Sequence, residues 1–311
     1  MKALYKDKFT SVEDIQNRFE AAQYICSQQI ATCVYIAHNL QKPIMVEGPA
    51  GVGKTELAKT TAQILDVPLV RLQCYEGLDE SKALYEWEYA KQLLYTQMVK
   101  EKINDIVSES ATLNEAIDQI AEHEDAFFSE KFIQTRPLLQ AISSEEPVVL
   151  LVDEVDKSDP EFEAFLLELL SDFQVTIPEI GTIQATTQPL VFLTSNNYRD
   201  LSDALKRRCI HLYIDYPAIE TEIEIVKMKL PEIDNALLEK LVKMIAAIRD
   251  LDLKKQPCIS ETLDWGRSLV ALQIEDLSAE TIAETLNTIC KHKSDYAVVK
   301  KNILEIVKKG E

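Results

Sequence analysis

Two short stretches of the chain carry residues whose types and spacing suit phosphate and metal chemistry. The first fits the pattern G-x-x-x-x-G-K-[ST], and its members are Gly48, Pro49, Ala50, Gly51, Val52, Gly53, Lys54 and Thr55, with Glu56 directly after them. Three of the seven glycines of the chain lie in this stretch. Because glycine allows positive φ and a close approach of backbone to a ligand, the stretch predicts a phosphate-binding loop. An ordinary glycine-rich turn is the alternative.

The flanks of this loop strengthen the prediction. An apolar run, PIMV, precedes the loop, and a helix-forming segment, residues 54–65, follows it. In that order, the loop and the first helical turn point unpaired N–H groups at one anion site. Lys54 would reach the β and γ phosphates of a nucleotide, and the Thr55 hydroxyl would bind Mg²⁺.

The second stretch, EEPVVLLVDEVDKSDP, places two carboxylates directly after a buried strand. At the carboxyl edge of a parallel sheet, Asp153 can hold Mg²⁺ through water, and Glu154 is suited to polarise an attacking water. A base for water favours a hydrolase over a small-molecule kinase. Two solvated acids at a strand end are the alternative.

Two further stretches offer polar groups to the same edge. The strand 190–194 ends in Ser195-Asn196-Asn197, and the Asn196 amide could bond the γ-phosphate and the attacking water. A turn filled by asparagine is the alternative. The segment LSDALKRRC predicts a short helix that Ser202 caps and that ends in cations. An arginine there, Arg207 or Arg208, could enter the site of a neighbouring subunit.

The elements that must position these residues follow from the apolar pattern. Strand-like runs occur at residues 44–46, 69–73, 148–152, 190–194 and 210–214, separated by helix-period segments. This pattern predicts an α/β fold with a mostly parallel sheet covered by helices on both faces. We expect a nucleotide-binding domain over residues 1–216, with a helical insertion over about 76–141, and a small all-helical lid domain over 217–311.

Composition limits the remaining classes of function. The formal net charge of the 311 residues is −19, which disfavours a surface for nucleic acid or an anionic membrane. The six cysteines form no CxxC pair and suggest reduced thiols in a cytoplasmic protein. No apolar run approaches membrane length, so we expect no membrane insertion. The chain lacks an N-K-x-D signal for guanine, and therefore ATP is the expected nucleotide.

These motifs, in this order and followed by helices, resemble those of the AAA+ ATPases. The stretches VEGPAGVGKTELAK and VVLLVDEVDKSDPEFEAFLLELLSDFQVTIPEIG are similar to the Walker A, Walker B and hairpin segments of the MoxR-type branch. The stretches RLQCYEGLDESKALYEWEYAKQLL and FIQTRPLLQAI resemble the CoxD-like group within it, which occurs beside von Willebrand factor A domain partners.

The resemblance implies roles residue by residue. Lys54 and Thr55 would complete Walker A, Asp153 and Glu154 would be the Walker B pair, and Asn196 would be sensor 1. Arg208 matches the arginine-finger position better than Arg207. The family often has Ser-x-Arg at the start of a lid helix, whereas this chain has Ser260-Glu261-Thr262. Arg267 is the nearest substitute for the sensor 2 arginine.

The resemblance also implies a function. We expect a Mg²⁺-dependent ATPase that forms a hexameric ring and remodels or activates a protein client, with a von Willebrand factor A partner. The hairpin at residues 174–185 is a candidate contact for a partner or client. A nucleic-acid-dependent motor or loader of the same superfamily is the alternative, and the net charge argues against it.

Overall fold

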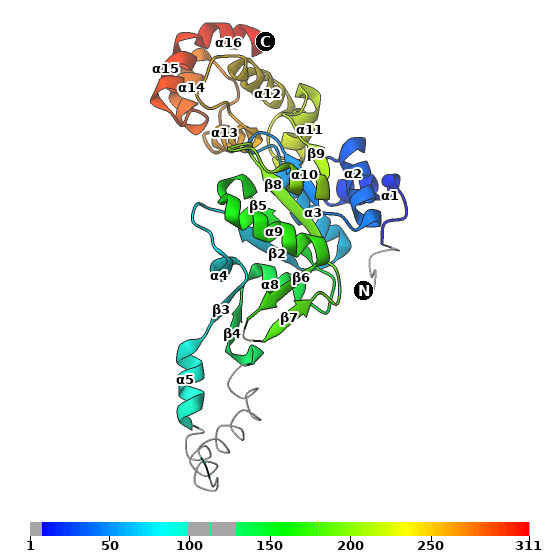
Figure 1. Ribbon diagram of the computed structural model, residues 1–311. Helices are drawn as coiled ribbons and strands as arrows, with labels where there is room; N and C mark the ends of the chain where they lie inside the picture. The colour runs from blue at the N-terminus through cyan, green and yellow to red at the C-terminus, as the bar shows by residue number, and fades with distance from the viewer. Residues whose placement is uncertain (1–7, 99–111, 113–128, 179, 311) are drawn as a thin grey trace.

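The computed structural model describes residues 8–98, 112, 129–178 and 180–310 (Figure 1). Its centre is a five-stranded parallel sheet in the order β2-β5-β8-β1-β9. The strands are β1 (Ile44–Glu47), β2 (Leu69–Gln73), β5 (Val149–Asp153), β8 (Leu190–Ser195) and β9 (Ile210–Tyr213). All five predicted strands are therefore present, each within one residue of its expected ends.

Helices cover both faces of this sheet. Successive side chains of β5 alternate between two apolar clusters, with Val149 and Leu151 on one face and Leu150 and Val152 on the other. The first face packs against α1 (Val12–Ala21), α2 (Gln28–Leu40) and α3 (Lys54–Leu65). The second packs against α8 (Pro137–Ile142), α9 (Pro160–Asp172) and α10 (Asp203–Arg208). The expected α/β architecture is confirmed.

The segment 76–141 differs in part from the helical insertion that the sequence predicts. Its described elements are α4 (Glu80–Ala83), β3 (Tyr85–Trp87), α5 (Tyr89–Met98), the 3-10 helix η2 (Glu130–Phe132), β4 (Ile133–Thr135) and most of α8. Strands β3 and β4 pair antiparallel, so a purely helical insertion is wrong. Aromatic residues favour strands, and Trp87 is buried in this ribbon. The middle of the expected insertion, residues 99–111 and 113–128, lies outside the described residues.

The strand pattern ends after β9, and the C-terminal region is helical as expected. Its elements are α11 (Ile219–Lys229), α12 (Asn235–Arg249), α13 (Ile259–Ala271), α14 (Ala279–Thr285), η4 (Leu286–Thr288), α15 (Lys293–Lys301) and α16 (Ile303–Gly310). They share an apolar cluster of their own, centred on residues such as Ile245 and Trp265. In Figure 1 they group beyond one end of the sheet, with α11 and α13 nearest to it.

The predicted hairpin is present as well. Strand β6 (Gln174–Ile177) pairs antiparallel with β7 (Gly181–Gln184), while Glu179 in the expected turn lies outside the described residues. Asp159 stands at the N-cap of α9, but its carboxylate accepts a hydrogen bond from the Gly77 N–H instead of capping the helix. Among the described residues, no helix combines the length and the apolar character that a membrane crossing requires.

Candidate active site at the carboxyl edge of the sheet

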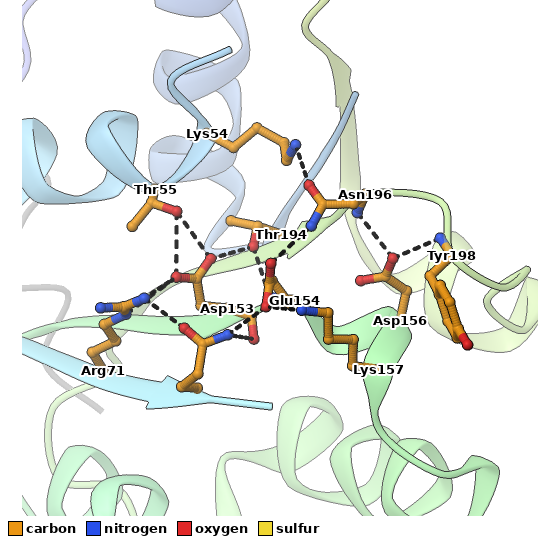
Figure 2. A network of polar contacts seen from close by, with 11 residues as sticks. Lys54, Thr55, Arg71, Asp153, Glu154, Asp156, Lys157, Thr194, Asn196 and Tyr198 are labelled. Carbon is orange, nitrogen blue, oxygen red and sulfur yellow. Dashed lines mark hydrogen bonds and ion pairs between the residues drawn. The ribbon is translucent and has the colours of Figure 1, made fainter. Parts of the chain in front are cut away.

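The order of the strands brings the predicted motifs together. The phosphate loop, residues 48–55, follows β1, the acidic pair lies at the end of β5, and Asn196 follows β8, which lies between those two strands. Because parallel strands end at the same edge of a sheet, all three sets of side chains meet there. Figure 2 shows Lys54, Thr55, Asp153, Glu154 and Asn196 joined in one network of polar contacts.

The glycines of the phosphate loop are required by its geometry. Gly48 has φ of +150°, and a Cβ built on it would lie 1.9 Å from the Ile214 carbonyl oxygen. Gly51 has φ of +74°, and its Cβ would lie 2.1 Å from Cys258 Sγ at the start of α13. Gly53 has φ of +97° and stands at the N-cap of α3. No larger residue would let this backbone close around a ligand without strain.

Lys54 is the buried cation of the loop, with 6% of its surface exposed. Its Nζ donates to the carbonyl oxygens of Gly48 at 2.7 Å and Pro49 at 2.6 Å, and to Asn196 Oδ1 at 2.7 Å. Burial lowers the pKa of Lys54, and the nearby carboxylates, led by that of Asp156, oppose this shift. A buried ammonium with three oxygen partners is suited to exchange one of them for a phosphate oxygen.

Asp153 is a buried carboxylate beside the loop, with 4% of its side chain exposed. The Thr55 hydroxyl donates to it at 3.0 Å, the Thr194 hydroxyl donates at 2.6 Å, and Arg71 Nη2 forms an ion pair at 2.6 Å. A threonine hydroxyl and a carboxylate beside a phosphate loop are hard oxygen donors that suit Mg²⁺, which needs only one or two protein ligands besides phosphate and water. These residues therefore fit the expected metal.

Glu154 lies next to this pair in a left-handed conformation, with φ of +57°. Such a conformation is uncommon for a residue other than glycine and is found at functional sites. Its Oε1 accepts from Asn196 Nδ2 at 3.0 Å, while Oε2 accepts from Gln73 Nε2 at 2.8 Å and Lys157 Nζ at 2.7 Å. The bond to Glu154 raises the pKa of Lys157. The carboxylate is thus aimed into the network and held from both sides.

Asn196 connects the two halves of the site. Its amide oxygen accepts from Lys54 and its amide nitrogen donates to Glu154, so one side chain connects the phosphate loop to the acidic pair. Asp156, which is 1% exposed, holds the backbone of this loop because Oδ2 accepts from Asn196 N at 3.0 Å and Tyr198 N at 2.7 Å. The turn therefore presents the amide rigidly to the network.

A cavity of about 890 Å³ opens in front of this edge. The loop residues 50–56, both Walker B carboxylates and Asn196 line one side of it. The segment before α2, including Tyr24, and the linker 213–217 line another. Helices α11 and α13 complete the wall with side chains such as Ile225 and Leu263. The volume and the mixture of apolar and charged walls suit a nucleotide.

The predicted arginines do not lie in this cavity. Arg208 is exposed on α10, where Nε donates to Ser171 Oγ at 2.8 Å, and Arg207 beside it is also exposed. Arg267 pairs with Asp264 at 3.3 Å, with 57% of its side chain exposed. Thr262 is fully buried and donates to Glu222 at 2.7 Å. Helix α13 therefore gives the described site no arginine.

Sequence reasoning missed five residues that contact the motif residues: Lys157, which pairs with Glu154, and four others. Arg71 and Gln73 on β2 reach Asp153 and Glu154, Thr194 on β8 reaches Asp153, and Asp156 holds the Asn196 loop. A signal was present for two of them, since Arg71 and Gln73 are polar residues at alternate positions of a strand that ends at the same edge. Their partners depend on which strand β2 pairs with.

The fold and the site define a class of protein: a P-loop nucleoside triphosphatase, with its phosphate loop after β1 and its acidic pair at the end of β5. Residues 44–216 match the family described as "ATPase family associated with various cellular activities (AAA)". The match covers more than half of the chain, and the chain belongs to this family. ATP binding and hydrolysis are the chemistry of that family.

Similar proteins occur in staphylococci and among solved structures. Uncharacterized protein SH1500 of Staphylococcus haemolyticus (strain JCSC1435) is 24% identical over 75% of this chain and 78% of its own length. Uncharacterized protein SAOUHSC_01413 of Staphylococcus aureus (strain NCTC 8325 / PS 47) is 23% identical over 85% of this chain and 92% of its own. The Thermotoga maritima RuvB Holliday junction branch migration motor is 16% identical, with a TM-score of 0.46 over 97% of this chain and 80% of that one.

Proposed function

We propose that this chain is a Mg²⁺-dependent ATPase of the MoxR type that assembles into a hexameric ring and remodels or activates a partner protein. The partner that fits the CoxD-like stretches is a protein with a von Willebrand factor A domain. The observation that carries the ATPase part is the Asn196 amide, which bridges the buried Lys54 ammonium and the Glu154 carboxylate. All six cysteines are free thiols, which supports the cytoplasm as its location.

The residues of the site divide the chemistry among them. The backbone N–H groups of the loop, residues 48–56, cradle the phosphates, and Lys54 exchanges a carbonyl partner for a phosphate oxygen. Thr55 and Asp153 hold Mg²⁺, which when bound neutralises charge that develops on the transferred phosphoryl group. Glu154 orients and polarises the attacking water, and Asn196 fixes Glu154 relative to Lys54.

The ring part of the proposal assigns roles outside the cavity. Arg208 is exposed and belongs to an element at the surface, so it is free to enter the site of an adjacent subunit. We take residues 1–216 as the nucleotide-binding domain and 217–311 as a lid that responds to the γ-phosphate. The apolar cluster of the C-terminal helices supports this division. The hairpin β6–β7 is the proposed contact with partner or client.

The Glu154→Gln variant tests the catalytic assignment. It keeps the side-chain shape and removes the base, so ATP should stay bound while turnover falls by about 10²–10³-fold. Glu161→Gln, an exposed glutamate on α9, is the matched control and should turn over normally. Unchanged hydrolysis in Glu154→Gln would exclude Glu154 as the base.

The same variant tests the assembly and the client. With ATP, Glu154→Gln should sediment as a six-subunit ring and retain its partner in a pull-down, whereas Glu161→Gln should release it. Recovery of a protein that carries a von Willebrand factor A domain supports the proposal. A monomer that retains no protein would overturn the ring and client assignments. Turnover that polynucleotide stimulates in a salt-sensitive way would instead favour the nucleic-acid motor.

A further inference from the structure

Arg71 places a second cation at the carboxylate that is assigned to the metal. Strand β2 is the edge strand beside β5, and its residue Arg71 extends along that strand to the end of β5 (Figure 2). Both Nε, at 3.1 Å, and Nη2, at 2.6 Å, donate to the same oxygen, Asp153 Oδ2. The Thr55 hydroxyl lies 3.3 Å from that oxygen as well. The guanidinium therefore bonds an oxygen that the Thr55 hydroxyl also reaches, although that hydroxyl lies nearer to Asp153 Oδ1, at 3.0 Å.

The two partners of this ion pair differ in their freedom to move. The Arg71 side chain is 46% exposed and lines the cavity, whereas the Asp153 side chain is 4% exposed. Besides Asp153, the guanidinium contacts Gln73 Oε1 at 2.5 Å, a side chain that is itself exposed. Arg71 can leave the carboxylate without losing contact with water, and the carboxylate cannot follow it.

The charges of the network explain why Asp153 pairs with Arg71. The network contains three carboxylates, those of Asp153, Glu154 and Asp156, and three cations, Lys54, Arg71 and Lys157 (Figure 2). Lys157 pairs with Glu154, and Lys54 faces the loop carbonyls and Asn196. Arg71 is the cation that compensates Asp153. A buried carboxylate without a partner is costly and would repel an anionic ligand.

We propose that Arg71 is a resident counter-ion of the metal carboxylate, which Mg²⁺ must displace, and that Arg71 thereby sets how strongly nucleotide binding depends on Mg²⁺. The inference depends on the proposed function, because it assumes that nucleotide and Mg²⁺ bind at this edge. Without metal, Arg71 screens Asp153 from the phosphates. With metal, the guanidinium competes for the same oxygen.

The two effects have opposite signs, and this makes the proposal testable by binding alone. In Arg71→Gln, ADP should bind more weakly than to the unaltered protein in EDTA, because Asp153 is then uncompensated. In saturating Mg²⁺, ADP should bind to Arg71→Gln at least as tightly as to the unaltered protein. The Mg²⁺ concentration that gives half of the full effect on ADP binding should fall. The ratio of the two dissociation constants, EDTA over Mg²⁺, should rise by about tenfold, the effect of a partly buried ion pair.

Calorimetric titration of ADP into the full chain measures this ratio. Arg71→Lys, which keeps the charge, should give a ratio close to that of the unaltered protein. Arg18→Gln is the matched control, since Arg18 is 40% exposed and pairs with Asp14 away from the cavity; its ratio should not change. Thermal unfolding of each variant reports any damage to β2.

The outcomes separate this inference from the proposed function. A ratio that is unchanged or lower in Arg71→Gln, including equal weakening in both conditions, would overturn the counter-ion role and leave Arg71 as a support for its strand. A failure of the unaltered protein to bind ADP in either condition would instead overturn the nucleotide site itself. A rise in the ratio with Arg71→Gln but not with Arg18→Gln supports the proposal.

Discussion

The carboxyl edge of the sheet and the first turns of α13 line the same cavity with different kinds of side chain. At the sheet edge, the charged side chains of Lys54 and Asp153 are buried, and each is hydrogen-bonded to polar neighbours, Lys54 to Asn196 and Asp153 to Thr55. On α13, the cavity receives Ile259, Ser260 and Leu263. Two other side chains of that helix turn elsewhere, since Thr262 contacts Glu222 and Arg267 contacts Asp264.

This difference indicates that the sheet supplies the electrostatics of the site and the C-terminal helices supply an adjustable wall. Buried, mutually bonded charges fix each other in place, because any one that moves leaves its partner unsatisfied. Apolar contacts carry no such directional constraint and can slide. In the described arrangement the helices can therefore shift against the cavity while the polar network stays intact.

The largest effect on nucleotide affinity should distinguish Lys54 from Lys229, two lysines that line the cavity. Lys54→Ala removes a buried cation with three oxygen partners, so nucleotide affinity should fall about hundredfold, the loss of strong charge-assisted bonds. Lys229 on α11 lines the same cavity, but its side chain is 35% exposed and lies 4.0 Å from Glu56. Lys229→Ala should change affinity by about twofold or less. Fluorescence titration with a labelled nucleotide measures both, and equal losses would contradict the division.

The sequence could predict the sheet and its motif residues because both depend on local patterns. The run VVLLV predicts a buried strand wherever it lies, and the residues after it must reach the strand end. The phosphate loop likewise carries its strand, loop and helix within about twenty residues. Asn196 was found in the same way, as the polar residue that follows an apolar strand.

The contacts that the sequence could not predict depend on pairing between distant segments. Arg71 meets Asp153 only because β2 pairs with β5 in parallel, with Gln73 opposite Asp153. The ribbon of β3 and β4 was missed for the same reason, since Trp87 pairs with Ile133 across the insertion. Three-residue strands carry too little periodicity to be separated from helical surroundings.

Two buried carboxylates, each 1% exposed, provide the next test. Glu222 in the helical region accepts both arms of the Arg249 guanidinium and the Thr262 hydroxyl. Glu222→Gln should lower the free energy of unfolding by about 3 kcal/mol, because Arg249 is left without its charge partner, and should leave nucleotide affinity nearly unchanged.

Asp156 is the counterpart at the sheet edge, and its substitution should act on function instead. Asp156→Asn weakens the bonds to the N–H groups of Asn196 and Tyr198. The rise in the activation free energy of turnover should therefore exceed the fall in the free energy of unfolding. Chemical denaturation and steady-state hydrolysis, measured on both variants, give the two readouts. If Glu222→Gln lost turnover and kept stability, the helical region would contribute more than a wall.

A smaller loss of stability is expected where the phosphate loop contacts the start of α13. Gly51 in the phosphate loop lies against Cys258, and a Cβ there would meet Sγ at 2.1 Å and the cysteine Cβ at 2.6 Å. Gly51→Ala should therefore cost about 2 kcal/mol of stability through overpacking. Gly53→Ala is the control, because its φ is also positive but the nearest atom, Tyr24 Oη, is 3.9 Å away.

The overpacking in Gly51→Ala can also be relieved by a change at Cys258. Cys258→Gly removes both atoms that the new methyl group would meet, so the double variant should recover most of the difference between Gly51→Ala and Gly53→Ala. Thermal unfolding in the absence of nucleotide gives these values. No recovery in the double variant would place the cost in the loop backbone alone and show that the helices do not press on the loop.

The smallest effect is expected at Arg267, the predicted sensor 2 residue. It lies four residues beyond Leu263 on α13, about one helical turn or 6 Å further along the axis, and its exposed pair with Asp264 holds it there weakly. In an isolated subunit, Arg267→Ala should change ATP affinity by about twofold or less. In the assembled ring the same variant is the sharpest probe of the adjustable wall. If turnover then falls tenfold or more while Asp264→Ala leaves it unchanged, Arg267 acts on the phosphates only in the assembled ring, as the sensor 2 assignment requires.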